Sequence, residues 1–388
     1  MRLVHLKTNL GHHHTALTDA LYDILGDNYI FIDLGILTKQ RGENKSSVRG
    51  VNFHKGRPYI IKINDSKESE LKAKELIQEA DVLISGGILN QSINERIKNG
   101  KLTFLSTERH LKGPLWKDIL RAPLMFAENT KYSSPYLRYL SQSAFFPNDI
   151  RLCGNRFKER CYKFAYFTEI PKLNITQIID SRRKDKIQIV WCARFIDWKH
   201  PELPIKMAKR MVDSGRKNFE IRMIGADATP LWYKIRSEIE VKQLQQHVIL
   251  TGGMPNNDVL ECMRQSHIFI FTSDRGEGWG AVLNEAMGAG CACVASNEIG
   301  SVPFLLKHKK NGLVFKSCSA ESLFQNVAYL YDNPEYCAEY GINAYHTITN
   351  EWSAKNAAER LVSLSESILL GNEIMFDDGP CAKAKPIG

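Results

Sequence analysis

Long apolar runs are missing from this 388-residue chain, and none reaches the roughly 18 consecutive residues that a membrane-spanning helix needs. The first residues, Met1–Leu6, resemble a strand and carry no extended apolar region followed by a cleavage site. Apolar residues make up 43% of the chain and charged residues 24%, which is typical of a globular protein. We therefore expect a globular, non-secreted protein of two domains.

Paired cysteines are also missing. The nine cysteines are scattered and odd in number, and no C-x-x-C pair occurs. Cys291 and Cys293 flank one residue in an apolar run, so as strand residues they share a face. No second pair completes a metal site, and core packing is the expected role of both. This cysteine usage predicts a reducing, cytoplasmic compartment.

Basic runs interleaved with aromatic residues are absent, so nucleic acid is not an expected partner. The net charge is nevertheless +9. Residues 1–180 hold 27 Lys and Arg against 19 Asp and Glu, whereas the remainder holds 25 against 24. An anionic partner of the N-terminal half, such as a phospholipid surface or a phosphate-bearing acceptor, would account for this bias, and so would general solubility.

Short apolar runs alternate with amphipathic stretches along both halves of the chain. This alternation is typical of βαβ units, so we expect an α/β protein with two doubly wound, Rossmann-like domains. The charged run Ser181–Lys186 marks the boundary. We expect one domain over 1–175 and another over 186–345, then a helix over 346–370 that could pack back on the first domain and a loosely ordered tail over 371–388.

Two glutamates, Glu277 and Glu285, lie in a segment that follows a predicted buried strand, Ile268–Phe271. A glycine-rich turn comes next and good helix formers follow it, so the segment predicts a strand, a turn and a helix N-terminus. Free backbone N–H groups and the positive end of the helix dipole suit a phosphate group at such a turn. A ligand with a sugar on each side of a pyrophosphate would find a carboxylate at both ends, although two carboxylates could also form an acid/base pair.

Two cations, Arg194 and Lys199, lie in a loop after the first predicted strand of the second half. Fixed cations stabilise the negative charge that a diphosphate leaving group gains as its bond breaks. A pair of solvated surface cations is the alternative. No D-x-D motif occurs, so a metal-dependent donor site is not predicted, and this pair would supply the charge that Mg²⁺ otherwise provides.

Taken together, these segments resemble glycosyltransferase family 4. The resemblance rests on the basic loop 194–202, followed by a glycine turn with E-x7-E in 277–290. Residues 101–109 (KLTFLSTER) resemble the KLTF-x-x-SER segment of bacterial capsule and exopolysaccharide members, with a threonine in place of the serine. Residues 162–167 (YKFAYF) resemble their YKWGYF segment. The similarity covers nearly the whole chain.

The resemblance implies a GT-B architecture, with two Rossmann-like domains facing across a cleft, and a retaining, hexosyltransferase-type enzyme. The donor would be a nucleotide-diphospho-sugar, with UDP favoured as the commonest nucleotide, and no cofactor or metal would be required. By match to the motif, Arg194 and Lys199 would hold the diphosphate. Glu285 would accept hydrogen bonds from the ribose, and Glu277 would contact the transferred sugar.

Smaller residues complete the donor site that the resemblance implies. Backbone N–H groups of Gly278, Trp279 and Gly280 would approach the phosphate and the sugar, which glycine permits. The base would lie against the loop that contains Thr251 and Gly252.

The loop after the first predicted strand carries three adjacent histidines. In the family, this loop faces donor and acceptor across the cleft, and this bacterial subgroup tends to show paired histidines there. Gly11, His12 and His13 are therefore candidates for the donor or acceptor contact, with His13 in a catalytic role. A solvated turn and a metal site are the alternatives. Glu108 and Arg109, after another predicted strand, could line the cleft or form a structural ion pair.

The expected activity is transfer of a sugar to a glycan acceptor on a lipid carrier, in the synthesis of a surface polysaccharide such as capsule or lipopolysaccharide. The protein would then act in the cytoplasm, peripherally on the inner face of the membrane. A nucleotide-sugar epimerase or a glycan phosphorylase on the same fold is the alternative. A non-catalytic partner of a glycan assembly complex is disfavoured, because nothing else would require both glutamates and both cations together.

Overall fold

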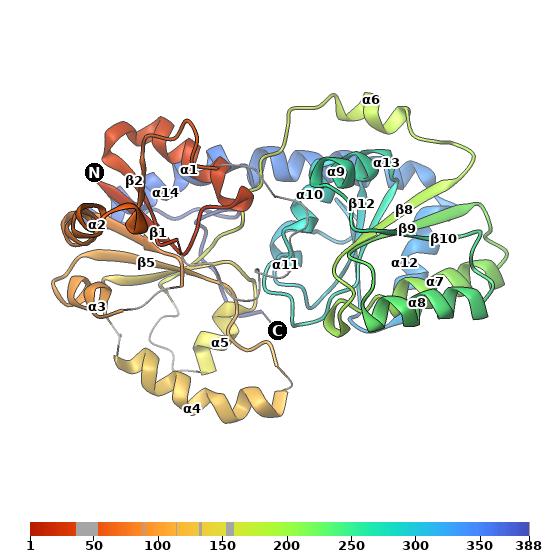
Figure 1. Cartoon of the computed structure of the whole chain (residues 1–388), viewed down its shortest axis with the longest axis horizontal. Coiled ribbons are helices and arrows are strands. Elements are labelled where there is room, and N and C mark those ends of the chain that lie inside the picture. The colour runs from red at the N-terminus through yellow and green to blue at the C-terminus, as the bar shows by residue number, and fades with distance from the viewer. Residues whose placement is uncertain (36–52, 88–89, 114, 132–133, 153–158, 388) are drawn as a thin grey trace. The chain divides into compact units, whose positions relative to one another are not determined.

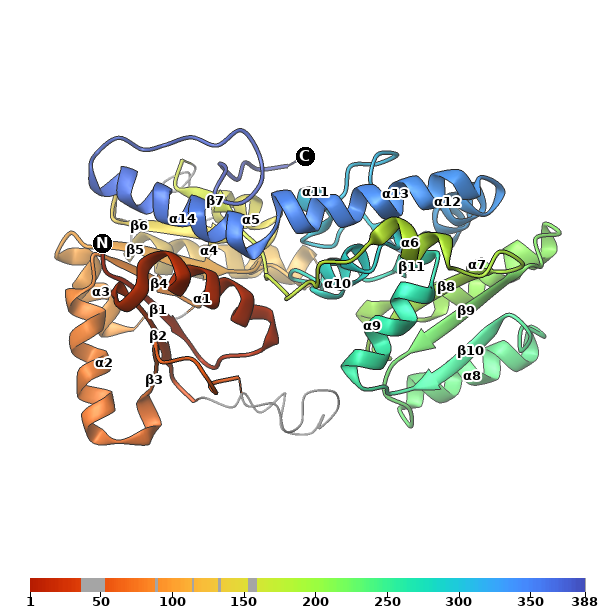
Figure 2. The same ribbon diagram turned by 90° about the horizontal axis from the view of Figure 1, so that it is seen from above.

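The computed structural model describes residues 1–35, 53–87, 90–113, 115–131, 134–152 and 159–387. These residues form two compact units, each built around its own parallel sheet (Figures 1 and 2). Unit 1 contains the described residues up to Glu169 together with the C-terminal segment from Glu351, and unit 2 contains Ile170–Asn350. The predicted α/β class with two parallel, doubly wound sheets is confirmed.

Unit 1 has a seven-stranded sheet in the order β3-β2-β1-β4-β5-β6-β7, with all pairs parallel. The central strands β1 and β4 are buried along their whole length, as expected for strands covered by helices on both faces. The order reverses between β1 and β4. The strands are β1 (Leu3–Lys7), β2 (Tyr29–Asp33), β3 (Ile60–Lys62), β4 (Val82–Ser85), β5 (Leu102–Thr107), β6 (Leu137–Ser141) and β7 (Cys161–Lys163).

Side chains cap the N-termini of two helices of unit 1, α2 and α3. Ser66 accepts a hydrogen bond from the Ser69 N–H at the start of α2, and Asn90 accepts one from the Ile93 N–H at the start of α3. The last helix, α14, packs against α1, so the end of the chain belongs to unit 1. The helices are α1 (His12–Leu25), α2 (Lys67–Glu79), α3 (Gln91–Lys98), α4 (Leu115–Lys131), α5 (Phe146–Leu152) and α14 (Ala354–Leu369), with single 3-10 turns at Gly26–Asn28 and Ile63–Asp65.

The C-terminal tail is ordered against unit 1, which corrects the prediction of a loosely ordered tail over 371–388. The N–H of Lys163 donates to the carbonyl of Ala382 at 2.7 Å, and the N–H of Ala384 donates to the carbonyl of Cys161 at 2.9 Å. The tail therefore continues the sheet beyond β7, antiparallel to it. The prediction failed because composition alone does not show that an edge strand leaves backbone groups free to pair with a distant segment.

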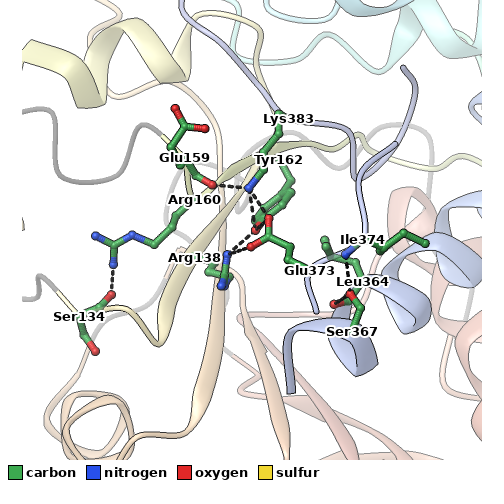
Figure 3. A network of polar contacts seen from close by, with 10 residues as sticks. All are labelled: Ser134, Arg138, Glu159, Arg160, Tyr162, Leu364, Ser367, Glu373, Ile374 and Lys383. Carbon is green, nitrogen blue, oxygen red and sulfur yellow. Dashed lines mark hydrogen bonds and ion pairs between the residues drawn. The ribbon is translucent and has the colours of Figure 1, made fainter. Parts of the chain in front are cut away.

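A polar network fixes the tail to the sheet (Figure 3). The Glu373 carboxylate accepts hydrogen bonds from Arg138 and from the Tyr162 hydroxyl, each at 2.8 Å, and it also pairs with Lys383. The tail residues Cys381, Ala382 and Ala384 are buried. The tail is thus held on unit 1 by its small apolar side chains and by the Glu373 carboxylate, whereas its composition predicts an exposed segment.

Unit 2 has a six-stranded parallel sheet in the order β10-β9-β8-β11-β12-β13, which reverses between β8 and β11. Its strands are β8 (Ile187–Cys192), β9 (Phe219–Ile224), β10 (Val248–Gly252), β11 (Ile268–Phe271), β12 (Ala292–Ser296) and β13 (Leu313–Phe315). Its helices are α6 (Ile175–Asp180), α7 (Glu202–Asp213), α8 (Pro230–Val241), α9 (Asn256–Gln265), α10 (Val282–Gly288), α11 (Val302–Leu305), α12 (Ala320–Asp332) and α13 (Pro334–His346), with a 3-10 turn at Asp197–Lys199 and a π-helical turn at Thr347–Glu351.

The core of unit 2 lies between this sheet and its helices and includes Trp191, Met223, Ile270 and Val294. Cys291 and Cys293 are fully buried, as their core-packing role requires. Helix α13 begins at Pro334, and proline is favoured at the first position of a helix. Among the described residues, no helix is both long enough and apolar enough to cross a bilayer.

Candidate functional site

The loops after β8 and β11 lie side by side at the carboxyl edge of the unit 2 sheet. β8 pairs with β9 on one side and with β11 on the other. After β8 the chain continues to β9, and after β11 it continues to β12, on the opposite side of the sheet. Crevices at such a reversal are where doubly wound sheets bind ligands. The fold thus brings the predicted cations and Glu277 to one place.

Hydrogen bonds fasten the two loops together. The Asp274 N–H donates to the carbonyl of Trp198 at 3.0 Å, and the Thr272 hydroxyl donates to the carbonyl of Lys199 at 2.6 Å. The Trp191 indole N–H in turn donates to Thr272 at 2.8 Å. The backbone of Lys199 is therefore held by a buried polar chain that starts in the core.

Lys199 and Glu277 form a buried ion pair between the loops. Their side chains are 10% and 11% exposed. The Ser273 hydroxyl donates a second hydrogen bond to the same Glu277 oxygen at 3.0 Å. Because a buried charge is tolerated only with a partner, each side chain fixes the position of the other. The Glu277 carboxylate is therefore held by both Lys199 and Ser273.

The indole of Trp198 brings the second cation to the same surface. The Lys199 ammonium lies 4.3 Å from the ring centroid and the Arg194 guanidinium lies 5.8 Å from it, both within cation–π range. Arg194 is exposed, whereas Lys199 is buried. One cation is therefore fixed, and the other is available to solvent and to an incoming anion.

His200 joins the loops from the other side, and sequence reasoning missed it. Its ring nitrogens lie 3.0 Å from Glu202 and 3.0 Å from Asp274. These two carboxylates, Asp274 foremost, raise the pKa of His200 to about 10, so the imidazole is protonated at neutral pH. The residue adopts a left-handed backbone conformation with φ 49°. In the sequence, Glu202 lies close enough to His200 to indicate a carboxylate partner. Asp274 is distant along the chain and reaches His200 only in the folded protein.

The glycine turn before α10 is tightly packed. Gly280 has φ +84°, and a Cβ built there would lie 2.6 Å from the Phe271 ring. Trp279 is fully buried, and its indole N–H donates to Asn284 at 3.0 Å. Gly278 is also buried. Helix α10 begins at Val282, after this turn.

Glu285 lies in α10 and is half-buried. Burial raises its pKa to about 7, and among the described residues no charge or hydrogen bond offsets this effect. Burial likewise raises the pKa of the Cys192 thiol to about 12, and the charge of Glu285 adds to the shift. The Glu285 carboxyl and the Cys192 thiol at the end of β8 are therefore electrostatically coupled.

Thr251 and Gly252 end β10 at the same edge of the sheet. The Thr251 hydroxyl donates to the carbonyl of Gly252 at 3.1 Å, and Gly252 has φ +74°. The Gly225 N–H donates to the Gly252 carbonyl at 3.1 Å, which ties the ends of β9 and β10 together. These residues share the edge with the ion pair but lie two strands from β8.

The predicted residues of unit 1 occupy the corresponding edge of the other sheet. Gly11 is the N-cap of α1, and His12 and His13 form its first turn rather than a loop. The His13 ring stacks on Tyr166 with centroids 5.9 Å apart. They follow β1, where the strand order of unit 1 reverses. The structure therefore groups them with aromatic residues of unit 1.

Glu108 and Arg109 both make polar contacts within unit 1. The Tyr166 hydroxyl donates to Glu108 at 2.8 Å, and Lys112 pairs with the same carboxylate at 2.5 Å. Arg109 lies 3.5 Å from Asp149. Both charges are thus engaged within unit 1.

Residues 175–347, nearly all of unit 2, match the family model described as "Glycosyl transferases group 1". The match covers less than half of the whole chain, and over that part the chain is similar to glycosyltransferases of this group. In sequence, the chain is 26% identical over 147 residues to WcaL of Escherichia coli, which is named as a colanic acid biosynthesis glycosyltransferase; the match covers 37% of this chain and 35% of WcaL. The curated glycosyltransferases that it resembles are matched over 52%, 35% and 48% of their lengths, so the chain spans about half of them or less.

Solved structures show the fold of the whole chain. A glycosyltransferase of Rickettsia africae superposes with a TM-score of 0.66 at 15% identity, covering 95% of this chain and 98% of that one. HepE of Anabaena in complex with UDP superposes with a TM-score of 0.67 at 14% identity, covering 95% of this chain and 100% of that one. At such identities the likeness concerns the fold, and it confirms the predicted GT-B architecture.

Proposed function

We propose that this chain is a retaining glycosyltransferase that moves a sugar from a nucleotide-diphospho-sugar to a glycan acceptor. The observation that carries the proposal is the Lys199–Glu277 ion pair, held at the strand-order reversal of the unit that is similar to group 1 glycosyltransferases. An anion-binding cation and a hydroxyl-binding carboxylate at one ligand-binding edge are what a sugar diphosphate requires.

In this proposal, the diphosphate lies against Lys199 and Arg194. As the bond between the sugar and the diphosphate breaks, the leaving group gains negative charge, and preorganised cations stabilise it. Trp198 keeps both cations near one surface. The pair supplies the charge compensation that a divalent metal gives in other transferases, so we expect activity without added metal.

The two glutamates hold the two sugars of the donor. Glu277, already oriented by Lys199 and Ser273, accepts hydrogen bonds from hydroxyls of the transferred sugar. Glu285 accepts hydrogen bonds from the ribose. The N–H groups of Gly278, Trp279 and Gly280 approach the phosphate, and the base lies toward Thr251 and Gly252. UDP is the favoured nucleotide, which accords with UDP in the structure of HepE.

Transfer with retention requires the acceptor hydroxyl to attack the anomeric carbon from the face that the diphosphate leaves. The departing phosphate oxygen then takes the hydroxyl proton, so no enzymic nucleophile is needed. His12 and His13 serve the acceptor side in unit 1. A surface polysaccharide intermediate on a lipid carrier is the proposed acceptor, which the colanic acid relative supports. Such an acceptor would place the protein at the cytoplasmic membrane face.

A product assay tests this proposal. The protein is incubated with a panel of nucleotide-sugars, with and without membranes that carry lipid-linked glycans, and the products are separated. We expect nucleoside diphosphate release that depends on the acceptor, and a product with the donor's anomeric configuration. Isomerised nucleotide-sugar without acceptor would indicate an epimerase, and a requirement for inorganic phosphate would indicate a phosphorylase; either result overturns the proposal.

A further inference from the structure

Helix α4 of unit 1 carries a cluster of large apolar side chains on its exposed side. Trp116, Ile119, Leu120, Leu124 and Phe126 are 61%, 61%, 68%, 70% and 43% exposed. No other helix among the described residues has so many large exposed apolar side chains. Burial in the core of unit 1 therefore does not explain why this helix is apolar.

These side chains form one continuous face. At about 100° per residue, the five fall within an arc of about 160° around the helix axis. Asp118 lies on the opposite side, where it is buried and faces Gly113. The acidic side chain thus points into the protein, whereas the apolar face points away from it. In Figure 1, α4 runs along the outside of unit 1.

The charges beside this face are positive. Lys117 and Arg121 are exposed and fall next to each other at one border of the arc. The Lys117 ammonium lies 5.2 Å from the centroid of the Trp116 ring. Between residues 116 and 126, among the side chains that the structure describes, the only acidic one is the buried Asp118. The face is therefore apolar at its centre and cationic at its border.

We propose that α4 is an interfacial helix that docks unit 1 on an anionic phospholipid bilayer. An apolar face with tryptophan and a lysine/arginine border matches a bilayer, where the apolar side chains enter the boundary of the acyl chains and the cations meet lipid phosphates. Charge complementarity favours this occupant over a second copy of the chain, because two cationic borders would repel each other. Residues 1–180 hold 27 basic and 19 acidic residues, and this positive net charge also favours an anionic bilayer.

This inference rests on the proposed function only for the idea that the acceptor is held in a membrane. Vesicle binding is measured without donor or acceptor, so the two proposals can fail separately. Transfer to a soluble acceptor analogue tests the proposed function without α4, because no membrane is present in that assay.

The test is flotation of the full chain with phosphatidylcholine vesicles that contain or lack phosphatidylglycerol. We expect binding that requires the anionic lipid and weakens with salt. Leu120→Glu/Leu124→Glu should lower binding by about tenfold or more, and Lys117→Ser/Arg121→Ser should lower it by about tenfold or more as well. The control Leu71→Glu, which alters an exposed leucine on α2, should bind as the wild type does.

Folding and self-association are checked in parallel. Circular dichroism and thermal melts should show that all variants remain folded. Lys117→Ser/Arg121→Ser removes only exposed charges, so this variant still tests the proposal if Leu120→Glu/Leu124→Glu does not fold. The proposal would be overturned if the wild-type protein did not float with vesicles that contain phosphatidylglycerol. A wild-type dimer in sedimentation velocity that Leu120→Glu/Leu124→Glu converts to a monomer would also overturn it, since the face would then belong to a second copy.

Discussion

Lys199 and Glu277 are joined by a buried ion pair, although 77 residues separate them along the chain and each belongs to a different loop. The pair lies where the strand order of unit 2 reverses. The proposed donor site and the position of the two loops therefore share one contact.

Removing either partner should damage both activity and stability. In Lys199→Ala or Glu277→Ala, one buried charge loses its compensation, and we expect the free energy of unfolding to fall by about 3 kcal/mol. Loss of the contacts to the donor should lower kcat/KM for transfer by about 100-fold or more. The double variant should be little worse than either single variant, because the two act as a unit. Urea denaturation and initial rates measure these effects.

The exposed pair Lys209–Asp213 on α7 is the matched control for this cycle. Lys209→Ala/Asp213→Ala should change the free energy of unfolding by less than about 1 kcal/mol and leave transfer unchanged. Additive losses for the Lys199 and Glu277 variants, or full activity in either, would show that the ion pair has no role in the donor site.

His200 should stabilise unit 2 in a pH-dependent way. Its pKa is raised to about 10 by Asp274 and Glu202, so its contribution is complete below the unfolded value near 6.5 and is lost as the pH rises through about 10. His200→Gly keeps the left-handed conformation available and removes only the bridge. We expect this variant to lose roughly 1–2 kcal/mol near pH 6, after allowance for solvent screening, and to approach the wild type near pH 10. Denaturant titrations at both pH values test the expectation; an equal deficit at both would contradict it.

Glu285 should make nucleotide binding depend on pH. Burial raises its pKa to about 7, whereas ribose hydroxyls donate best to the ionised form, so affinity should rise as the pH increases through about 7. Glu285→Gln should bind more weakly with little pH dependence. The stability effect has the opposite sign, because a raised carboxyl pKa costs stability above pH 7, and Glu285→Gln should raise the free energy of unfolding there by roughly 1–3 kcal/mol.

Calorimetric titrations of nucleotide across pH 6 to about 8 measure the binding effect, and denaturant titrations measure stability. Glu335→Gln, which alters an exposed glutamate of α13, is the control and should match the wild type in both. A pH profile that persists unchanged in Glu285→Gln would assign the titration to another group.

The packing around Gly280 should not tolerate a side chain. Gly280→Ala places a Cβ 2.6 Å from the Phe271 ring at φ +84°, so it combines backbone strain with a clash. Gly371→Ala is the matched control, since φ is +79° there and nothing lies within 4 Å of the Cβ. We expect about 1 kcal/mol of destabilisation for the control and roughly 2–4 kcal/mol for Gly280→Ala. Equal melting temperatures for the two variants would mean that the Phe271 ring moves aside without lowering the free energy of unfolding.

The sequence predicted the α/β class because alternating apolar and amphipathic periods are local signals. It also predicted that Arg194, Lys199 and Glu277 share a site, since loops after parallel strands meet at one edge. It did not predict that Lys199 and Glu277 pair, or that His200 reaches Asp274, because those contacts depend on the three-dimensional approach of two loops. The tail was assigned wrongly for a related reason. The pairing of residues near Lys383 with β7 is non-local, and composition does not report it.

Isothermal titration calorimetry of UDP with the wild type and with Lys199→Ala shows whether Lys199 holds the diphosphate of the donor. We expect measurable affinity for UDP in the wild type without added metal, a loss of about tenfold or more in Lys199→Ala, and no loss in Lys209→Ala. Equal affinity of the wild type and Lys199→Ala for UDP, or no binding of UDP, GDP or ADP to the wild type, would contradict a donor site at this edge of the sheet.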